Sequence, residues 1–352
     1  MKKDLLNYIV CPKCKSEFKL EIYREENSEI IEGILICKSN HSFPISKGVP
    51  RLLDERNFEI SKKQVQDSFS KKWAPETGAG LSGAAMIDKE FYNDWYLEKY
   101  GFKNLDGLKN FLKDKKFVID AGTGPGRDAL LFSEISDGII FAVDLSNSVE
   151  GLQERYKDKK NIYFIQTDIM NLPFKENFFD YISCDFVIHH TPNPIKTFNH
   201  LVSHLKKGGQ IATYTYKIKG PVREFVDDDI RERTTKMSFE ECYKICEPIT
   251  KLGKTLSDLN IEFEVPEDIP LLGIKAGKQN LQRFIYWNFM KCYWSNNLSF
   301  KDNVIVNVDW YHPIDAFRFK PEEIKSWAHE NNLDIINFHI SEPGISIRAK
   351  KL

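Results

Sequence analysis

The sequence predicts an α/β fold in which a mostly parallel sheet is preceded by a small cysteine-bearing unit and interrupted by a largely helical insertion. From Phe117 onward, short apolar runs alternate with polar segments of helical character. Cys11, Cys14 and Cys37 gather near the N-terminus, whereas the other cysteines are scattered. Residues 217–318 then break the alternation. These three observations give the fold class and its units.

The predicted strands are nearly continuous apolar runs, as expected for a parallel sheet buried on both faces. They cover residues 117–120, 139–144, 161–166, 180–187 and 209–216. The gaps leave room for crossover helices, predicted at 128–135, 147–156 and 194–206. A further helix begins near Pro321, and the last two strands, 333–340 and 344–350, are separated by a tight turn. That turn predicts an antiparallel final pair.

The chain therefore divides into four predicted parts. Residues 1–54 form the cysteine-bearing unit, and 55–116 form a helical linker or lid. Residues 117–216 and 319–352 form the core, and 217–318 form an insertion on the substrate side. In the linker we expect Trp73, Phe91, Trp95 and Tyr96 to be buried, and residues 74–80 to form a flexible loop.

Composition is that of an ordinary soluble globular protein. The chain has 352 residues, 41% hydrophobic and 29% charged, with a formal net charge of −1. This balance gives no whole-chain attraction to nucleic acid or to an anionic membrane. No apolar run is long enough to span a bilayer, and the N-terminus lacks a signal-peptide core. We therefore expect a cytoplasmic protein with reduced cysteines.

A glycine-rich segment, Asp120-Ala-Gly-Thr-Gly-Pro-Gly126, follows the first predicted strand and precedes a helix. Glycine is required where the backbone turns sharply and a ligand must approach it closely. The spacing G-x-G-x-G differs from the dinucleotide fingerprint G-x-G-x-x-G. Asp120 stands just before the first glycine, where it would disfavour a pyrophosphate but suit a ligand carrying an ammonium and a sulfonium.

This segment resembles the signature of class I S-adenosylmethionine-dependent methyltransferases, and the likeness extends from about Val118 to Ser183. The resemblance implies a Rossmann-like seven-stranded sheet whose last strand is antiparallel. It also implies that Asp144 binds both ribose hydroxyls, that Asp168 accepts from the adenine amino group, and that Ile169 lends a backbone N–H to the ring. Asp180 is expected to be structural. The predicted cofactor residues are Asp120, Gly122, Thr123, Gly124, Gly126, Asp144, Leu145, Asp168, Ile169 and Asp185.

The N-terminal unit carries four candidate metal ligands. Cys11-x-x-Cys14 and Cys37-x-x-x-His41 form a complete tetrahedral set, which predicts a structural Zn²⁺. The alternative is two unlinked cysteine pairs. With the run HSFPISKGVPRLL, the unit resembles Cys3His ribbon modules fused to some bacterial methyltransferases, including those that act on guanine in ribosomal RNA. The resemblance leaves the ribbon's part in substrate choice open.

Candidate catalytic residues follow the fourth strand and end the insertion. His189 and His190 are candidate general bases, with a loop-capping role as the alternative. His312 is a third candidate base, and Asp309 is its candidate partner or a base itself. The surrounding Asp-Trp-Tyr-His-Pro run is equally typical of a sugar-binding wall. An aromatic cluster in the insertion has helical spacing and predicts a packed core: Phe284, Tyr286, Trp287, Phe289, Tyr293 and Trp294.

Three functions remain open on the sequence. The first is O- or N-methylation of a small molecule or glycan precursor, such as a nucleotide-linked sugar. The second is methylation of a ribosomal or transfer RNA base, with the ribbon docking the RNA. The near-equal acidic and basic content of ribbon and insertion opposes it, and the missing N-P-P-Y run disfavours base N6 or N4 methylation. The third is a protein that only holds the cofactor. A homodimer through the insertion is also possible on its length.

Overall fold

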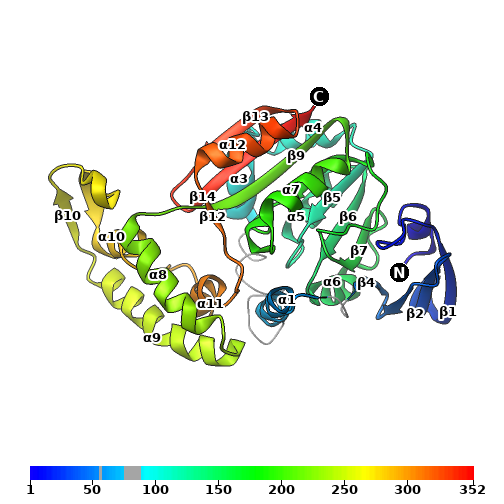
Figure 1. Ribbon diagram of the computed structural model, residues 1–352, viewed down its shortest axis with the longest axis horizontal. Helices are drawn as coiled ribbons and strands as arrows, with labels where there is room; N and C mark the ends of the chain where they lie inside the picture. Colours follow the sequence, from blue (N-terminus) through cyan, green and yellow to red (C-terminus); the bar gives the residue numbers. More distant parts are fainter. Residues whose placement is uncertain (55–57, 75–88) are drawn as a thin grey trace.

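The computed structural model describes residues 1–54, 58–74 and 89–352. The loop predicted at 74–80 lies, except for Ala74, outside the described residues. Figure 1 shows a central sheet with helices on both faces, the ribbon at one end and the insertion at the other. No described helix combines the length and the apolar character that a membrane crossing needs.

The core of the sheet runs in the order β7-β6-β5-β8-β9-β14-β13. Pairing is parallel from β7 to β9, and β14 is antiparallel to both of its neighbours. The predicted α/β fold with an antiparallel last strand is therefore confirmed. The strands are β5 (Phe117–Ala121), β6 (Ile139–Asp144), β7 (Ile162–Thr167), β8 (Phe179–Cys184), β9 (Leu205–Lys217), β13 (Leu333–Ile340) and β14 (Gly344–Lys351).

Helices cover both faces of this sheet, because its strands are apolar on both sides. On one face, α3 (Lys89–Tyr100), α4 (Leu105–Leu112), α5 (Arg127–Ile135) and α6 (Ser148–Tyr156) pack over one apolar cluster. On the other, α7 (Pro194–Ser203) and α12 (Pro321–Glu330) pack over a second cluster. Both α7 and α12 have proline in their first turn, and the predicted helix start at Pro321 is confirmed.

The ribbon extends the same sheet. It consists of η1 (Lys3–Asn7), β1 (Phe18–Glu26), β2 (Glu29–Cys37), β3 (Ser42–Ser46) and β4 (Val49–Leu52). β4 pairs in parallel with β7, placing Arg51 opposite Gln166 and Leu52 opposite Thr167. Leu5 and Ile9 lie in the same apolar cluster as the residues beneath α7 and α12. The ribbon is therefore fixed to the edge of the core by backbone pairing and by shared burial.

The insertion is a helical unit with its own apolar cluster. It comprises α8 (Pro221–Thr234), α9 (Phe239–Asp258), β10 (Glu262–Val265), η5 (Pro270–Leu272), β11 (Gly277–Asn280), α10 (Leu281–Asn288) and α11 (Phe300–Tyr311), and the short β12 (Arg318–Phe319) returns the chain to β9. Ser238 and Glu241 form a capping box at the start of α9. The aromatic residues predicted to pack do so in part from outside a helix: Tyr286 contacts Trp287 and Tyr293, and Phe284 contacts Phe289. Because α10 ends at Asn288, the predicted helical spacing fails beyond it.

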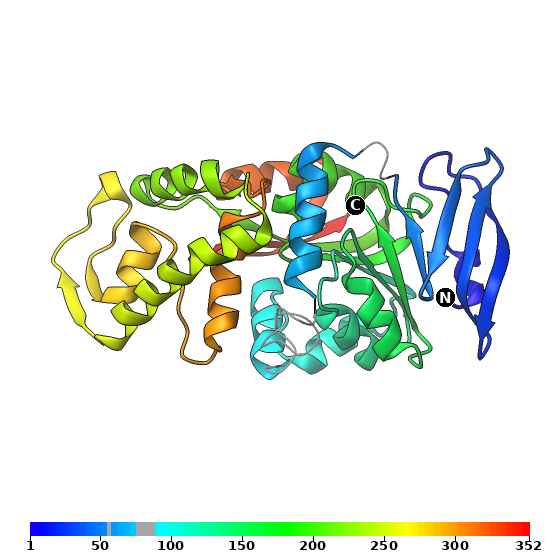
Figure 2. The same ribbon diagram turned by 90° about the horizontal axis from the view of Figure 1, so that it is seen from below.

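Helix α1 (Ile60–Lys72) lies between the core and the insertion, as Figure 2 shows. Its contacts to both sides are largely polar. Gln66 Nε2 donates to the Leu145 carbonyl at 3.2 Å on the core side. On the insertion side, Gln64 Nε2 donates to the His312 carbonyl at 2.7 Å, and Lys71 pairs with Glu240 at 2.7 Å. α1 therefore joins the two units.

The aromatic residues predicted to be buried in the linker behave differently from one another. Tyr96 is 1% exposed and packs beneath the sheet, as predicted. Phe91 is 58% exposed, so that prediction is wrong. Trp73 and Trp95 are only half-buried, because each presents part of its ring to a cavity. That cavity lies under α1.

Candidate cofactor and acceptor site

A cavity of about 290 Å³ opens at the carboxyl ends of β5, β6, β7 and β8 and is covered by α1. In doubly wound sheets ligands bind at this edge, because the loops leaving the parallel strands diverge there. All the predicted cofactor residues except Gly126 line this cavity. Gly126 instead caps the N-terminus of α5 with φ +84°, where Leu152 would lie 2.5 Å from an added Cβ.

The loop after β5 is shaped by glycine. Gly122 has φ +91°, and its N–H donates to the Val143 carbonyl at 2.8 Å. An added Cβ on Gly122 would stand 2.4 Å from Val187, closer than real Cβ atoms approach. Gly124 has φ +50° and faces the Trp73 ring, 3.2 Å from where its Cβ would be. The backbone is thus exposed to the cavity because no side chain fits there.

Asp144 closes β6 and braces this loop. Its Oδ2 accepts from the Gly124 N–H at 2.8 Å, and its Oδ1 accepts from the N–H and hydroxyl of Ser146 at 2.7 and 2.6 Å. A carboxylate has about four acceptor positions, so Asp144 retains capacity for a donor in the cavity. The protein's own N–H groups therefore fix the orientation of the acid predicted to hold the ribose.

Asp120 accepts hydrogen bonds from the glycine loop and from the first turn of α5. Its Oδ2 accepts from the Thr123 hydroxyl at 2.7 Å and from the Ala129 N–H at 3.1 Å. Burial, with repulsion from Asp128, raises the pKa of Asp120 to about 8. Near neutral pH this carboxyl is therefore mostly protonated.

Asp185 is held in a buried network that sequence reasoning missed. Lys99 Nζ lies 2.8 and 2.7 Å from its two oxygens, the Tyr100 hydroxyl donates at 2.6 Å, and Arg127 Nη2 donates at 3.0 Å. Asp185 lines the cavity as predicted, but its charge is already matched. Arg127 also lines the cavity, and its place directly after the glycine run was the signal that could have identified it. Phe186, next in the chain, has φ +60°, a strained conformation for a non-glycine residue.

Asp168 is contacted by α1. Its Oδ2 lies 2.7 Å from Lys62 Nζ, and its Oδ1 accepts from the Met170 N–H at 2.9 Å. Both side chains of the pair are mostly buried. A lysine of α1 therefore occupies an oxygen of the acid predicted to read adenine.

His190 lies at the far end of the cavity. Its Nδ1 lies 2.6 Å from the Asp315 carbonyl, which can only accept, so Nδ1 carries the proton and Nε2 is the acceptor nitrogen. Burial lowers the pKa of His190 to about 4, although Asp309 opposes the shift. The imidazole is therefore neutral at physiological pH.

The other catalytic candidates divide between two places. Asp309 lines the same cavity and pairs with Lys72 of α1 at 2.7 Å. His189 lies behind it, with its ring centre 3.7 Å from that of Tyr216 and the two planes tilted by 37°, and neither of its ring nitrogens has a hydrogen-bond partner among the described residues. His312 faces away, with Nδ1 2.8 Å from the Ser68 hydroxyl and Nε2 3.1 Å from the Met237 carbonyl. Since both of its nitrogens hold α1 and the insertion, we give His312 no proton-transfer role.

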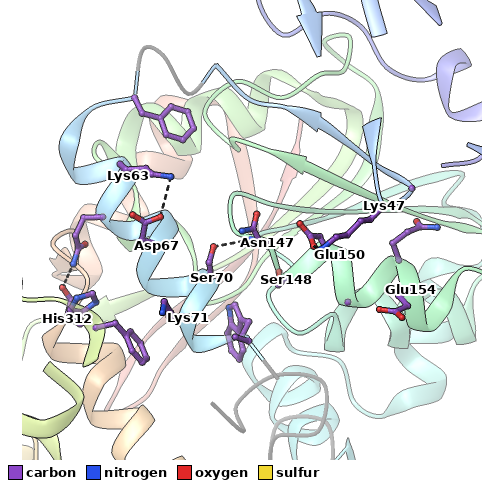
Figure 3. Close-up of a pocket in the computed structure, with 18 of the residues that line it drawn as sticks. Lys47, Lys63, Asp67, Ser70, Lys71, Asn147, Ser148, Glu150, Glu154 and His312 are labelled. Carbon is purple, nitrogen blue, oxygen red and sulfur yellow. Dashed lines mark hydrogen bonds and ion pairs between the residues drawn. The ribbon is translucent and has the colours of Figure 1, made fainter. Parts of the chain in front are cut away.

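His312 lines a second, wider groove on the opposite side of α1, which Figure 3 shows. This groove encloses about 1620 Å³ and shares only Trp73 with the cavity. Its charges neutralise one another: Lys63 pairs with Asp67 at 3.3 Å and Lys47 with Glu150 at 2.7 Å. The groove therefore presents no basic surface for nucleic acid.

In the ribbon, the four predicted zinc ligands come together. One ligand atom from each of Cys11, Cys14, Cys37 and His41 lies within 4.8 Å of the others. Cys37 Sγ is 3.5 Å from Cys14 Sγ and 3.4 Å from His41 Nδ1. Spacings of this size fit tetrahedral ligation at Zn–S of about 2.3 Å. The alternative of two unlinked cysteine pairs is thereby removed.

Asp180, which sequence analysis set apart, is structural. Its Oδ2 accepts from the N–H groups of Lys116 and Phe117 at 3.0 and 2.9 Å, and Lys206 pairs with its Oδ1 at 2.8 Å. It joins the start of β5 to the start of β8 and lies at the opposite end of these strands from the cavity.

Comparison with known families identifies two parts of the chain. Residues 119–213 match the family described as "Methyltransferase domain", and residues 2–48 match the family described as "Trm112p-like protein". The predicted methyltransferase domain and N-terminal zinc ribbon are therefore both confirmed.

Similar proteins cover only part of the chain. A demethylmenaquinone methyltransferase from Staphylococcus saprophyticus is 32% identical over 31% of this chain and 40% of its own length. Phosphoethanolamine N-methyltransferase 2 from Caenorhabditis elegans is 26% identical over 42% of this chain and 38% of its own length. A tRNA U34 carboxymethyltransferase from Campylobacter fetus is 33% identical over 36% of this chain and 44% of its own length. The chain thus spans about two fifths of the length of these relatives.

Proposed function

We propose that this chain, which joins a Trm112p-like zinc ribbon to a methyltransferase domain, transfers the methyl group of S-adenosylmethionine to oxygen or nitrogen of a small molecule. The observation that carries the proposal is the cavity itself. The cavity combines the glycine loop of Gly122 and Gly124, the acids Asp144 and Asp168 at the ends of β6 and β7, and the neutral His190 at its far end.

The residues present fit this cofactor. Gly122 and Gly124 leave backbone open where a Cβ would fill the space. Asp144 keeps acceptor capacity for a ribose hydroxyl, and Asp168 stands at the end of the neighbouring strand for the adenine amino group. Arg127 lines the same space and offers a guanidinium for the methionine carboxylate. The ribose, the adenine amino group and the carboxylate of the cofactor therefore each have a candidate partner in the cavity.

The chain's own residues then position the reactants. When bound, S-adenosylmethionine supplies an electrophilic methyl carbon on its sulfonium, which is displaced in line. The loop around Gly122 and Gly124, together with Asp144, would hold the cofactor in place. Helix α1 covers the cavity and excludes water from it. His190 Nε2 accepts the proton of an acceptor hydroxyl, and Asp309 stabilises the imidazolium that results, because the two charges attract.

The RNA alternative retains two arguments, the N-terminal zinc ribbon and a partial likeness to a tRNA-modifying protein. The charge pattern gives it no support: the groove between ribbon, α1 and insertion has internally paired charges. We therefore treat RNA as an outcome that the assay must be able to reveal.

The proposed activity is tested in two steps. Calorimetry with S-adenosylmethionine and S-adenosylhomocysteine measures cofactor binding by the full chain. Incubation with the methyl-labelled cofactor and separate pools of small metabolites, nucleotide sugars and total RNA then locates the label. Label in the small-metabolite or nucleotide-sugar pool supports the proposal. Label in RNA alone, or cofactor binding without transfer, contradicts it.

We expect Asp144→Asn to weaken cofactor binding by about 10- to 100-fold. The change removes a charge-assisted hydrogen bond worth about 1.5–3 kcal/mol. Calorimetric titration measures the loss. Asp137→Asn is the control, because Asp137 is exposed after α5 and outside the cavity. Equal affinities for the two variants would remove Asp144 from the ribose site.

We expect Lys62→Ala to tighten cofactor binding several-fold. Lys62 occupies an oxygen of Asp168, so an incoming adenine must displace it, and a half-buried pair of this kind costs about 1 kcal/mol to break. The matched control is Lys63→Ala, the next residue of α1, whose partner Asp67 lies outside the cavity. Weaker binding by Lys62→Ala would show instead that the ammonium supports the cofactor.

A further inference from the structure

The cavity is walled by aromatic rings that the cofactor-binding roles above do not use. They come from α1, α3, the loop after β8 and strand β9. All except Tyr216 are only half-buried, and each lines the cavity with part of its ring. Cations already lie over one face of several of them: Lys72 over Trp73 at 4.3 Å, Arg127 over Tyr92 at 5.0 Å, and Lys99 over Trp95 at 4.5 Å. The rings belong to Phe69, Trp73, Tyr92, Trp95, Phe186 and Tyr216.

Two of these rings lie beside the imidazole of His190. The Phe69 ring centre lies 5.0 Å from the imidazole in an edge-on arrangement, and the Tyr216 ring centre lies 5.5 Å away, nearly perpendicular to it. Phe186, held at φ +60°, lies 5.1 Å from Trp95. Strained non-glycine residues persist where the surroundings enforce them, often at binding sites. A flat ring entering between these walls would meet His190 Nε2 at its edge.

The charges of the cavity leave no net attraction for a charged acceptor. Among the described lining residues, Lys62, Lys72 and Arg127 are cations, and Lys99 stands behind Asp185. Six carboxyls line the cavity, so acidic side chains outnumber these four cations, although burial raises the pKa of Asp120. This balance suits the positive charge of the cofactor and leaves no surplus of cations for an anionic acceptor. An acceptor carrying phosphate would find Lys72 already paired with Asp309.

From this geometry we propose that the acceptor is an uncharged planar aromatic ring bearing a hydroxyl, a phenol or quinol, which stacks among these rings and donates its hydroxyl hydrogen to His190 Nε2. The inference rests on the proposed function and names its substrate class. The hydroxyl proton passes to Nε2, and an oxygen lone pair forms the new C–O bond. The C–S bond breaks with its electron pair on sulfur, leaving a neutral thioether, and the imidazolium later returns its proton to water.

The low pKa of His190 suits an acceptor whose hydroxyl is more acidic than that of an alcohol or of water. Its pKa is lowered to about 4 by burial, so it is a weak base. A phenolic hydroxyl ionises near pH 10, as tyrosine does, far below the pH at which water ionises. Proton transfer from a phenol to this weak base is therefore easier than from a hydroxyl as weakly acidic as water.

The test compares acceptor classes with the full zinc-loaded chain. Labelled S-adenosylmethionine is incubated separately with 2-naphthol, catechol, UDP-glucose and total tRNA, and products are identified by mass spectrometry. We expect a methyl group on the phenolic oxygen. Transfer only to UDP-glucose or tRNA, or no methylated phenol although calorimetry shows bound cofactor, overturns the inference. Failure to bind cofactor at all counts against the proposed function instead.

A variant separates proton transfer from a structural role. His190→Asn keeps a donor for the Asp315 carbonyl but removes Nε2. We expect kcat with 2-naphthol to fall about 10²–10⁴-fold, with an unchanged Kd for the cofactor. With p-nitrophenol, which ionises without help, the fall should be much smaller. Equal falls for the two phenols would overturn the role of His190 as proton acceptor.

A second variant tests the wall. Phe69→Leu shortens the ring beside His190 and is expected to raise KM for 2-naphthol about ten-fold while the cofactor Kd is unchanged. The matched control is Phe225→Leu on α8, because Phe225 is 76% exposed and lies outside the cavity. An unchanged KM for the Phe69 variant contradicts a stacked acceptor.

Discussion

We expect Gly122→Ala to weaken cofactor binding at least 100-fold. The new Cβ would lie 2.4 Å from Val187, so the loop after β5 must move or Val187 must enter the cavity. The residue also has φ +91°, which costs a side-chain-bearing residue about 1–3 kcal/mol. Calorimetric titration with S-adenosylhomocysteine measures the effect, and thermal unfolding shows how much of it is general destabilisation.

A matched glycine isolates the local clash. Gly208 also has a positive φ, +78°, but an added Cβ there meets nothing within 4 Å. Gly208→Ala should therefore lose only the backbone contribution to stability and keep its cofactor affinity. If both variants bind cofactor equally well, the glycine loop is not part of the site.

The second large effect concerns the ribbon. We expect Cys37→Ser to lose stoichiometric zinc and to lower the melting temperature of the whole chain by more than 10 °C. Zinc binding contributes about 10–16 kcal/mol to the folding of isolated zinc modules. Because β4 pairs with β7 and the two units share one apolar cluster, unfolding of the ribbon also exposes the edge of the core. The core should therefore lose stability together with the ribbon.

Metal content by atomic absorption and thermal unfolding by circular dichroism are the two measurements. Lys38→Ser is the control, since Lys38 is the exposed neighbour of Cys37 and is not a ligand. Full zinc content in the Cys37 variant would remove the cysteine from the ligand set. Zinc loss with an unchanged melting temperature would show that the core is stable without its ribbon.

The central strands were predictable because they are buried on both faces. Ile139–Asp144 coincides with its predicted run, since a strand covered on both faces must be apolar throughout. Leu333–Ile340 also coincides with its predicted run, although it is an edge strand that is largely exposed. The fourth run failed at its end: β8 stops at Cys184, and Phe186 leaves the strand with φ +60°. The hydrophobic pattern does not reveal where β8 ends, because the Phe186 side chain is apolar whether its backbone continues the strand or turns away from it. The junction of β4 with β7 depends on a pairing between distant short segments, which local patterns do not encode.

The site was partly predictable for a similar reason. A single glycine or acid after a strand has several explanations, but a set of them at fixed places has few. The residues around Asp120 and Asp144 were therefore predicted as one site, and they line one cavity. Lys62 and Lys72 were missed because a lysine on a polar helix looks like a solvated residue, and only the fold shows that they face inward. His312 looked catalytic because its neighbours are aromatic and polar. Its nitrogens in fact hold Ser68 and the Met237 carbonyl.

The polar attachment of α1 has a kinetic consequence. A helix that covers a cavity through hydrogen bonds and ion pairs exchanges them for water at modest cost when it lifts. For the proposed methyl transfer we expect α1 to lift for ligand entry and for release, and to cover the cavity during the chemistry. When opening is the slowest step it limits kcat, and the first turnover is faster than those that follow. The sequence of α1 would then tune the speed of the enzyme without touching the transferred methyl group.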